Sequence, residues 1–110
     1  GVTNPIPADV AREMGAEIVI AVAIPADVPP RTPKNPVAVA YHAVTIMAAE
    51  IGRLRLREAD IVIEPDVGDV AYDDFSQKKR LIDAGEAAAR AALPTVRALI
   101  AQRTRLAPAP

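Results

Sequence analysis

The sequence EIVIAVAI at residues 17–24 is the strongest indicator of the fold class of this chain. After its first residue it contains only apolar side chains, most of them β-branched, and such a run is typical of a strand buried on both faces. A second run, DIVIE at residues 60–64, repeats this chemistry and is followed by Pro65. The two runs therefore predict two buried strands.

A helix is expected between these strands. Asn35 followed by Pro36 is typical of a helix start, because Asn caps the first turn and Pro is tolerated at the first helical position. Apolar residues then recur every three or four positions, which predicts one apolar face on a helix over residues 37–57; they are Val37, Tyr41, Val44, Met47, Ile51 and Leu54. The order strand, helix, strand predicts a parallel, right-handed βαβ unit and thus an α/β fold with covering helices.

Shorter signals predict the elements before the first strand. Residues 4–7, Asn-Pro-Ile-Pro, are expected to be extended, because a residue before proline avoids the helical region. A short helix should follow, with Pro7 near its first turn and Gly15 as its end. Val10 and Met14 are expected on one face of that helix.

The C-terminal part of the chain predicts one long helical stripe over residues 75–101, capped by Asp73 or Asp74. Pro94 lies inside the stripe, which predicts a kink or two abutting helices. We expect residues 1–102 to form one incomplete domain segment and residues 103–110 to form a mobile tail.

Two strands that are apolar on both faces need helices on each side and further strands beside them. The chain contains no other strand candidate. The rest of the sheet is therefore expected outside it, in a preceding half of the same domain. A bare strand edge would otherwise pair with a second copy.

The amino-acid composition argues against several classes of function. A formal net charge of −1 provides no field to attract nucleic acid, and the absence of cysteine excludes disulfides, thiolate chemistry and cysteine-ligated zinc. No apolar run reaches the roughly 18 residues that a membrane span needs.

Few residues qualify for catalysis. Ser76 is the only serine, and its surroundings lack the G-x-S-x-G turn that presents a nucleophile, so we interpret it as a first-turn residue of a helix. His42 is the only histidine and has no visible nucleophile or orienting acid as partner. We interpret it as a surface or otherwise satisfied histidine.

The acidic loop EPDVGD at residues 64–69 contains the only candidate metal ligands, Asp66 and Asp69. Oxygen-rich loops with a glycine turn can hold calcium, but the spacing does not fit an EF-hand. Turn-forming aspartates explain the loop as well, so no metal is expected. Loops 25–35 and 66–74 follow the carboxyl ends of the predicted strands, where open parallel sheets bind ligands.

Three arginines alternate with leucines at the end of the central helix: Arg53, Arg55 and Arg57. They could form a patch for lipid phosphates, although such clusters usually hold about 4–8 basic residues. The interpretation that we favour is a solvated helix end whose cations complement the helix dipole.

Four segments in order resemble the end of the bacterial patatin-like phospholipase family. They are GVTNPIPADVAREMGAEIVIAV at residues 1–22, ADIVIEPDVGD at 59–69, Asp74-Phe75, and LIDAGEAAARAALPTVRALIA at 81–101. The resemblance implies that the chain is the C-terminal part of a three-layer α/β/α hydrolase domain. It also implies a protein that is cytoplasmic or peripheral to a membrane. Members of the family are serine acyl hydrolases with a Ser-Asp dyad, and they use no cofactor.

In this family the catalytic Asp opens a D-G-G or D-G-A motif that commonly continues as V-x-N-P-x-P. Gly1 matches the second glycine, and Asn4, Pro5 and Pro7 match the continuation. The resemblance thus implies that the dyad and the oxyanion hole precede Gly1, that no residue of this chain is catalytic, and that the chain alone is inactive. The complete protein would cleave lipid esters.

A second hypothesis is a non-catalytic α/β binding or interaction module that uses the acidic loop for contact with a metal or a protein. A family member with a degenerate dyad is a third. An Asp-Gly pair directly before Gly1 would favour the first hypothesis.

Overall fold

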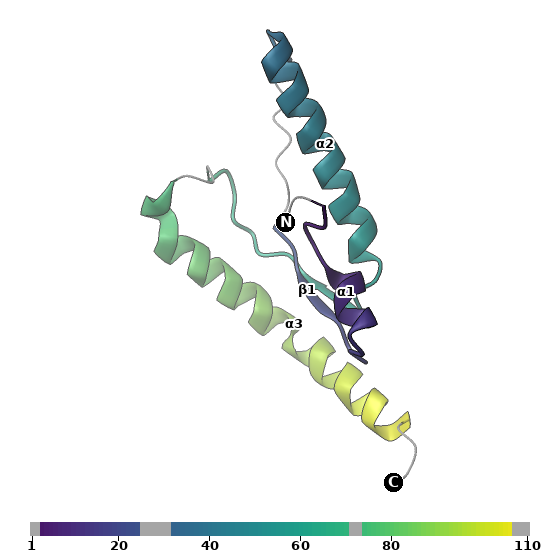
Figure 1. Ribbon diagram of the computed structural model, residues 1–110. Helices are drawn as coiled ribbons and strands as arrows, with labels where there is room; N and C mark the ends of the chain where they lie inside the picture. The colour runs from purple at the N-terminus through teal and green to yellow at the C-terminus, as the bar shows by residue number, and fades with distance from the viewer. Residues whose placement is uncertain (1–2, 25–31, 71–73, 107–110) are drawn as a thin grey trace. The chain divides into compact units, whose positions relative to one another are not determined.

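The computed structural model describes residues 3–24, 32–70 and 74–106. Its elements are α1 (Ala8–Glu13), β1 (Ile20–Val22), α2 (Pro36–Leu56), β2 (Ile61–Ile63), a short 3₁₀ turn η1 (Phe75–Gln77) and α3 (Lys78–Leu106) (Figure 1). The chain divides into two compact units, Gly1–Val62 and Ile63–Pro110.

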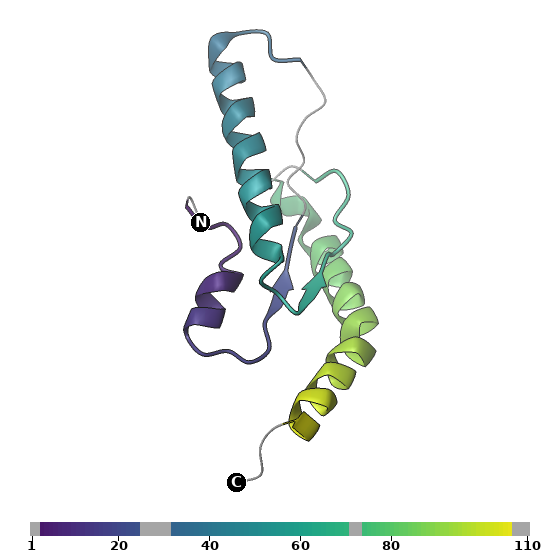
Figure 2. The ribbon, with the colours of Figure 1, turned by 90° about the vertical axis from the view of Figure 1, so that its right-hand side faces the viewer.

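Strands β1 and β2 form a two-stranded parallel sheet and are connected through α2, which confirms the predicted α/β class (Figure 2). The Val19 carbonyl accepts hydrogen bonds from the N–H groups of Asp60 at 2.8 Å and Ile61 at 3.3 Å. These bonds set the register and place Ile20 beside Ile61. Both strands are shorter than the predicted 17–24 and 60–64.

The prediction that the first strand is buried on both faces is wrong for the described chain. Val19, Ala21 and Ala23 are buried, whereas Ile20 is 43% exposed and Val22 is 62% exposed. Successive side chains of a strand point to opposite faces, so only the face with the smaller side chains is covered. An apolar run indicates that both faces of a strand favour burial. It does not show that this chain contains an element that packs on each face.

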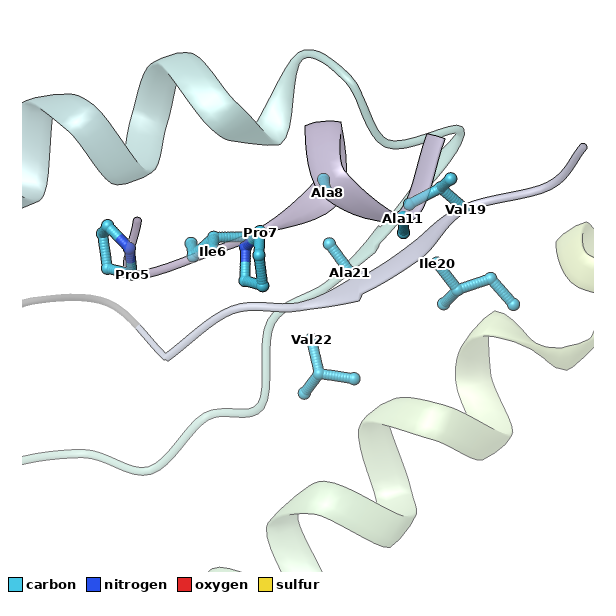
Figure 3. A pocket seen from close by; sticks show the side chains of 9 residues that line it. All are labelled: Pro5, Ile6, Pro7, Ala8, Ala11, Val19, Ile20, Ala21 and Val22. Atoms are coloured by element: carbon cyan, nitrogen blue, oxygen red, sulfur yellow. The ribbon is translucent and has the colours of Figure 1, made fainter. Parts of the chain in front are cut away.

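Helix α1 ends as predicted, because Gly15 adopts a left-handed conformation with φ of 97° just after it. The predicted contact face is wrong: Met14 is 84% exposed and Val10 is also exposed, whereas Ala8 is buried. The Ala8 and Ala11 side chains lie on the side of α1 that faces β1 (Figure 3). Their small size allows the helix to approach the strand closely.

Helix α2 begins as predicted. The Asn35 side chain accepts a hydrogen bond from the Ala38 N–H at 2.8 Å, and Pro36 is the first helical residue. Near the other end Gly52 is buried, and a Cβ there would lie 3.5 Å from Ile6 Cδ1. The C-terminal half of α2 therefore packs against the extended segment before α1.

Most of the predicted apolar face of α2 is exposed. Val37, Tyr41, Val44 and Met47 all lie open to solvent in the described structure. By length and composition alone, α2 is long and apolar enough to cross a membrane, which differs from the expectation that no apolar run has that length. A core helix of a soluble protein can have the same length and composition but is mostly buried, whereas α2 is mostly exposed in the described structure.

In the second unit, the Asp74 side chain accepts a hydrogen bond from the Ser76 N–H at 3.0 Å, as predicted for a cap. Asp73 lies outside the described residues. Helix α3 continues through Pro94, which contradicts the alternative of two abutting helices, while the alternative of a kink stays a prediction. Proline lacks the N–H for one internal hydrogen bond, and this loss does not end the helix. The helix also includes residues 103–106 of the predicted tail; residues 107–110 lie outside the described chain.

Candidate functional site

The segment that carries the family resemblance is anchored by Asn4. Its amide nitrogen Nδ2 donates a hydrogen bond to Asp9 Oδ1 at 2.8 Å, and Asp9 Oδ2 lies 2.9 Å from Arg55 Nη1. Asp9 belongs to the first turn of α1 and Arg55 to the last turn of α2. The extended segment is therefore tied to both helices of its unit.

This network shifts the acidity of Asp9. The hydrogen bond from the Asn4 amide, together with the positive charge of Arg55, lowers the pKa of the Asp9 carboxyl below its usual value. Both interactions favour the charged form, so the carboxylate keeps accepting from Asn4 at neutral pH.

The residues between Asn4 and α1 have little conformational freedom. Pro5 and Pro7 restrict their own φ angles, and the Ile6 carbonyl accepts a hydrogen bond from the Ala8 N–H at 2.8 Å. The Pro7 carbonyl accepts from the Ala11 N–H at 3.2 Å. Residues 4–7, which match the end of the family motif, therefore form a rigid connection to α1. Gly1 lies outside the described residues.

A groove separates this connection from β1. It has a volume of about 270 Å³ and is lined by residues 5–8, Ala11 and residues 19–22 (Figure 3). All of these side chains are apolar. The groove therefore offers no acid, base or nucleophile for chemistry.

An ion pair that the sequence analysis missed joins the ends of α1 and both strands. Arg12 Nη2 donates to Asp60 Oδ2 at 2.8 Å and to the Glu58 carbonyl at 3.0 Å. Arg12 Nη1 donates to the Glu17 carbonyl at 3.0 Å, and Asp60 Oδ2 also accepts the Val19 N–H at 2.9 Å. In the sequence, Arg12 and Asp60 each stand next to an apolar segment, but nothing there indicates that the two side chains meet.

Neither Ser76, the candidate nucleophile, nor His42, the candidate base, lies in a catalytic arrangement in the described structure. The Ser76 hydroxyl donates to the Asp74 carboxylate, and the hydrogen bonds from Ser76 lower the pKa of Asp74. Ser76 is exposed in the first turn before α3, in agreement with the capping interpretation. His42 lies partly buried within α2.

The candidate metal ligands Asp66 and Asp69 are both exposed. Gly68 forms the turn between them with φ of 60°, and the Val70 N–H donates to the Gly68 carbonyl at 3.1 Å. The Arg80 guanidinium lies directly over Gly68, since a Cβ there would be 2.6 Å from Arg80 Nη2. Within residues 3–24, 32–70 and 74–106, no three acidic, histidine or cysteine side chains are placed to hold a metal ion.

The three arginines at the end of α2 do not form a free basic patch. Arg53 pairs with Glu50 one turn earlier, and Arg55 pairs with Asp9. Two of the three positive charges are therefore matched by carboxylates of the chain itself. This arrangement favours the interpretation of a solvated helix end over a site for lipid phosphates.

Comparison with known proteins adds no assignment. No protein-family model and no curated protein sequence matches this chain.

Proposed function

We propose that this chain is the C-terminal structural part of a patatin-like lipid acyl hydrolase whose Ser-Asp dyad lies before residue 1. The proposal is based on the order of the resembling segments, and the observed α/β class is compatible with it. In this view the chain contributes the end of the sheet and covering helices, and it supplies no catalytic residue.

The observation that supports the proposal most is the anchoring of Asn4. If the catalytic Asp stands two positions before Gly1, the Asn4–Asp9–Arg55 network holds the backbone five residues beyond it. A general base must stay within hydrogen-bond reach of its nucleophile, so a rigid exit from its loop favours catalysis. Pro5 and Pro7 add to that rigidity.

The proposed reaction follows from a Ser-Asp pair. The serine hydroxyl attacks the carbonyl carbon of a lipid ester while the aspartate accepts its proton, and backbone N–H groups stabilise the oxyanion. The alcohol leaves, and water then hydrolyses the acyl-enzyme. In the proposed division of the domain, residues 1–110 position the aspartate loop.

The test is the coding sequence before residue 1. We expect Asp-Gly directly before Gly1 and a G-x-S-x-G turn within roughly 150–200 residues, the size that completes a single α/β domain. The complete polypeptide should hydrolyse p-nitrophenyl acyl esters, and replacing the serine of that turn should abolish the activity. An unrelated domain before Gly1 would contradict the proposal and favour a non-catalytic binding module.

A further inference from the structure

We infer that the outer edge of β1 is a pairing edge, and that its occupant is an uncharged, extended strand of the polypeptide that precedes residue 1. This inference deepens the proposed function, on which it rests, because it names the contact through which the two parts of the sheet join. It concerns only residues of the unit Gly1–Val62.

The direction of the backbone groups identifies this edge. Both backbone groups of Val19 face β2, since its carbonyl accepts from Asp60 and Ile61 and its N–H donates to the Asp60 carboxylate. Alternate residues of a strand direct their N–H and C=O groups to opposite edges. Ala21 therefore also faces β2, whereas Ile20 and Val22 direct theirs outward. The described sheet contains no third strand on that side.

The groove lies along the same edge. Its lining includes four consecutive residues of the strand region, 19–22, which belong to both faces of the sheet. Because Ile20 and Val22 direct their backbone groups outward, a groove that they line reaches this edge. The opposite wall is the segment at residues 5–8, in which Pro5 and Pro7 have no N–H to donate. That wall leaves the hydrogen-bonding groups of β1 available.

The chemistry of the edge specifies the occupant. Every lining side chain of the groove is apolar, so a charged segment would lose its hydration without finding a partner. The outward N–H and C=O groups of Ile20 and Val22 match the backbone of an extended chain. An uncharged strand satisfies both requirements, and it would also cover part of the exposed Ile20 and Val22 side chains.

The edge has none of the features that normally prevent pairing. Natural edge strands carry lysine, proline or a bulge, but residues 18–24 contain no charge, no proline and no glycine. Such a segment pairs readily with another strand. We therefore assign it to an edge that is covered in the complete protein.

Amide hydrogen exchange tests the inference residue by residue. In a dilute solution of the 110-residue chain, the Ala21 amide should exchange slowly, whereas the Ile20 and Val22 amides should exchange quickly. In the complete polypeptide the Ile20 and Val22 amides should exchange at least about 100-fold more slowly than in the chain alone, because buried strand amides open only with the sheet.

A matched pair of variants in the complete polypeptide controls for general destabilisation. Val22→Lys places a charge on a residue that lines the groove and should speed exchange at the Ile20 amide at least about tenfold. Ile24→Lys changes an equally exposed apolar residue outside the groove and should leave that amide unchanged. Equal effects of the two variants would contradict a role of the groove.

Three outcomes separate the possibilities. Rapid exchange at Ile20 and Val22 in the complete polypeptide, with Ala21 still protected, would overturn the inference. Protection that appears in the 110-residue chain as its concentration rises would also overturn it, because the occupant would be a second copy. Protection in a complete polypeptide that lacks a hydrolase dyad would support the pairing edge and contradict the proposed function.

Discussion

At the scale of single residues, the Arg12 guanidinium contributes most to joining distant parts of the chain. It bonds two backbone carbonyls before β1, the Glu58 carbonyl and the Asp60 carboxylate, whose side chain is 17% exposed. Arg12→Met keeps the apolar stem and removes these bonds. We expect a loss of about 1–3 kcal/mol in the free energy of unfolding, the range for charge-assisted hydrogen bonds that are partly screened by solvent.

Urea denaturation of the purified chain would measure this loss. Lys79→Met is the matched control, because the Lys79–Asp83 pair lies on an exposed helix face. Surface pairs of this kind contribute about 0–1 kcal/mol. Equal losses in the two variants would show that the Arg12 contacts are as weak as a surface ion pair.

A second prediction at the residue scale concerns the Asp9 carboxyl. Its pKa is lowered in the folded chain, first by the hydrogen bond from Asn4. A lowered folded pKa stabilises the native state above the usual carboxyl pKa of 3.8, and this stabilisation is lost as the pH falls through the folded pKa. Asn4→Ala should therefore raise the Asp9 pKa towards 3.8.

An NMR titration of the Asp9 side-chain carbon would detect the change. Thr3→Ala alters the preceding, exposed residue and should leave the Asp9 pKa as it is. If Asn4→Ala also leaves it unchanged, the Asn4 amide does not anchor the segment.

At the scale of the elements, two glycines of the C-terminal unit should respond in opposite directions to alanine. Gly85 lies inside α3 with nothing within 4 Å of a Cβ, so Gly85→Ala should stabilise the helix by about 1 kcal/mol. Gly68 has φ of 60°, and a Cβ there would meet Arg80. Gly68→Ala should destabilise the loop by about 1 kcal/mol or more. Thermal unfolding followed by circular dichroism compares the two; a shift in the same direction would contradict the loop geometry.

At the scale of the whole chain, small side chains dominate the described core. Its buried apolar residues are Ala8, Val19, Ala21, Ala23 and Ile61. We therefore expect the isolated 110-residue chain to unfold with a free energy below about 3 kcal/mol, less than ordinary domains. Equilibrium denaturation would measure it. A cooperative transition above about 5 kcal/mol would show that the chain is a complete domain.

The isolated chain should also be inactive. It should not hydrolyse p-nitrophenyl esters above background, because residual catalysis in a dismantled serine site still depends on an oxyanion hole. The proposal places that hole before residue 1. An initial burst of product that disappears in Ser76→Ala would show that the only serine is a nucleophile.

Several local features could be predicted from the sequence alone. Asn35 and Asp74 cap the starts of their helical segments, Gly15 follows the end of α1, and the two β-branched runs contain the paired strands. These features depend on residues within a few positions of one another, so pattern and propensity are enough to predict them. As residues of the candidate site, Asn4, Pro5 and Pro7 were indicated by the family resemblance and not by local pattern, and that assignment stays a prediction.

The contacts between distant parts of the chain could not be predicted in this way and were found only in the folded structure. The Arg12–Asp60 pair joins positions 48 apart, and the Asn4–Asp9–Arg55 network ties a segment to two helices. The structure also showed that alanines rather than Val10 and Met14 face β1. Such contacts depend on the packing of elements distant in sequence, where close approach favours small side chains. A hydrophobic pattern indicates how much surface needs a partner, whereas only the packed chain shows which partner it has.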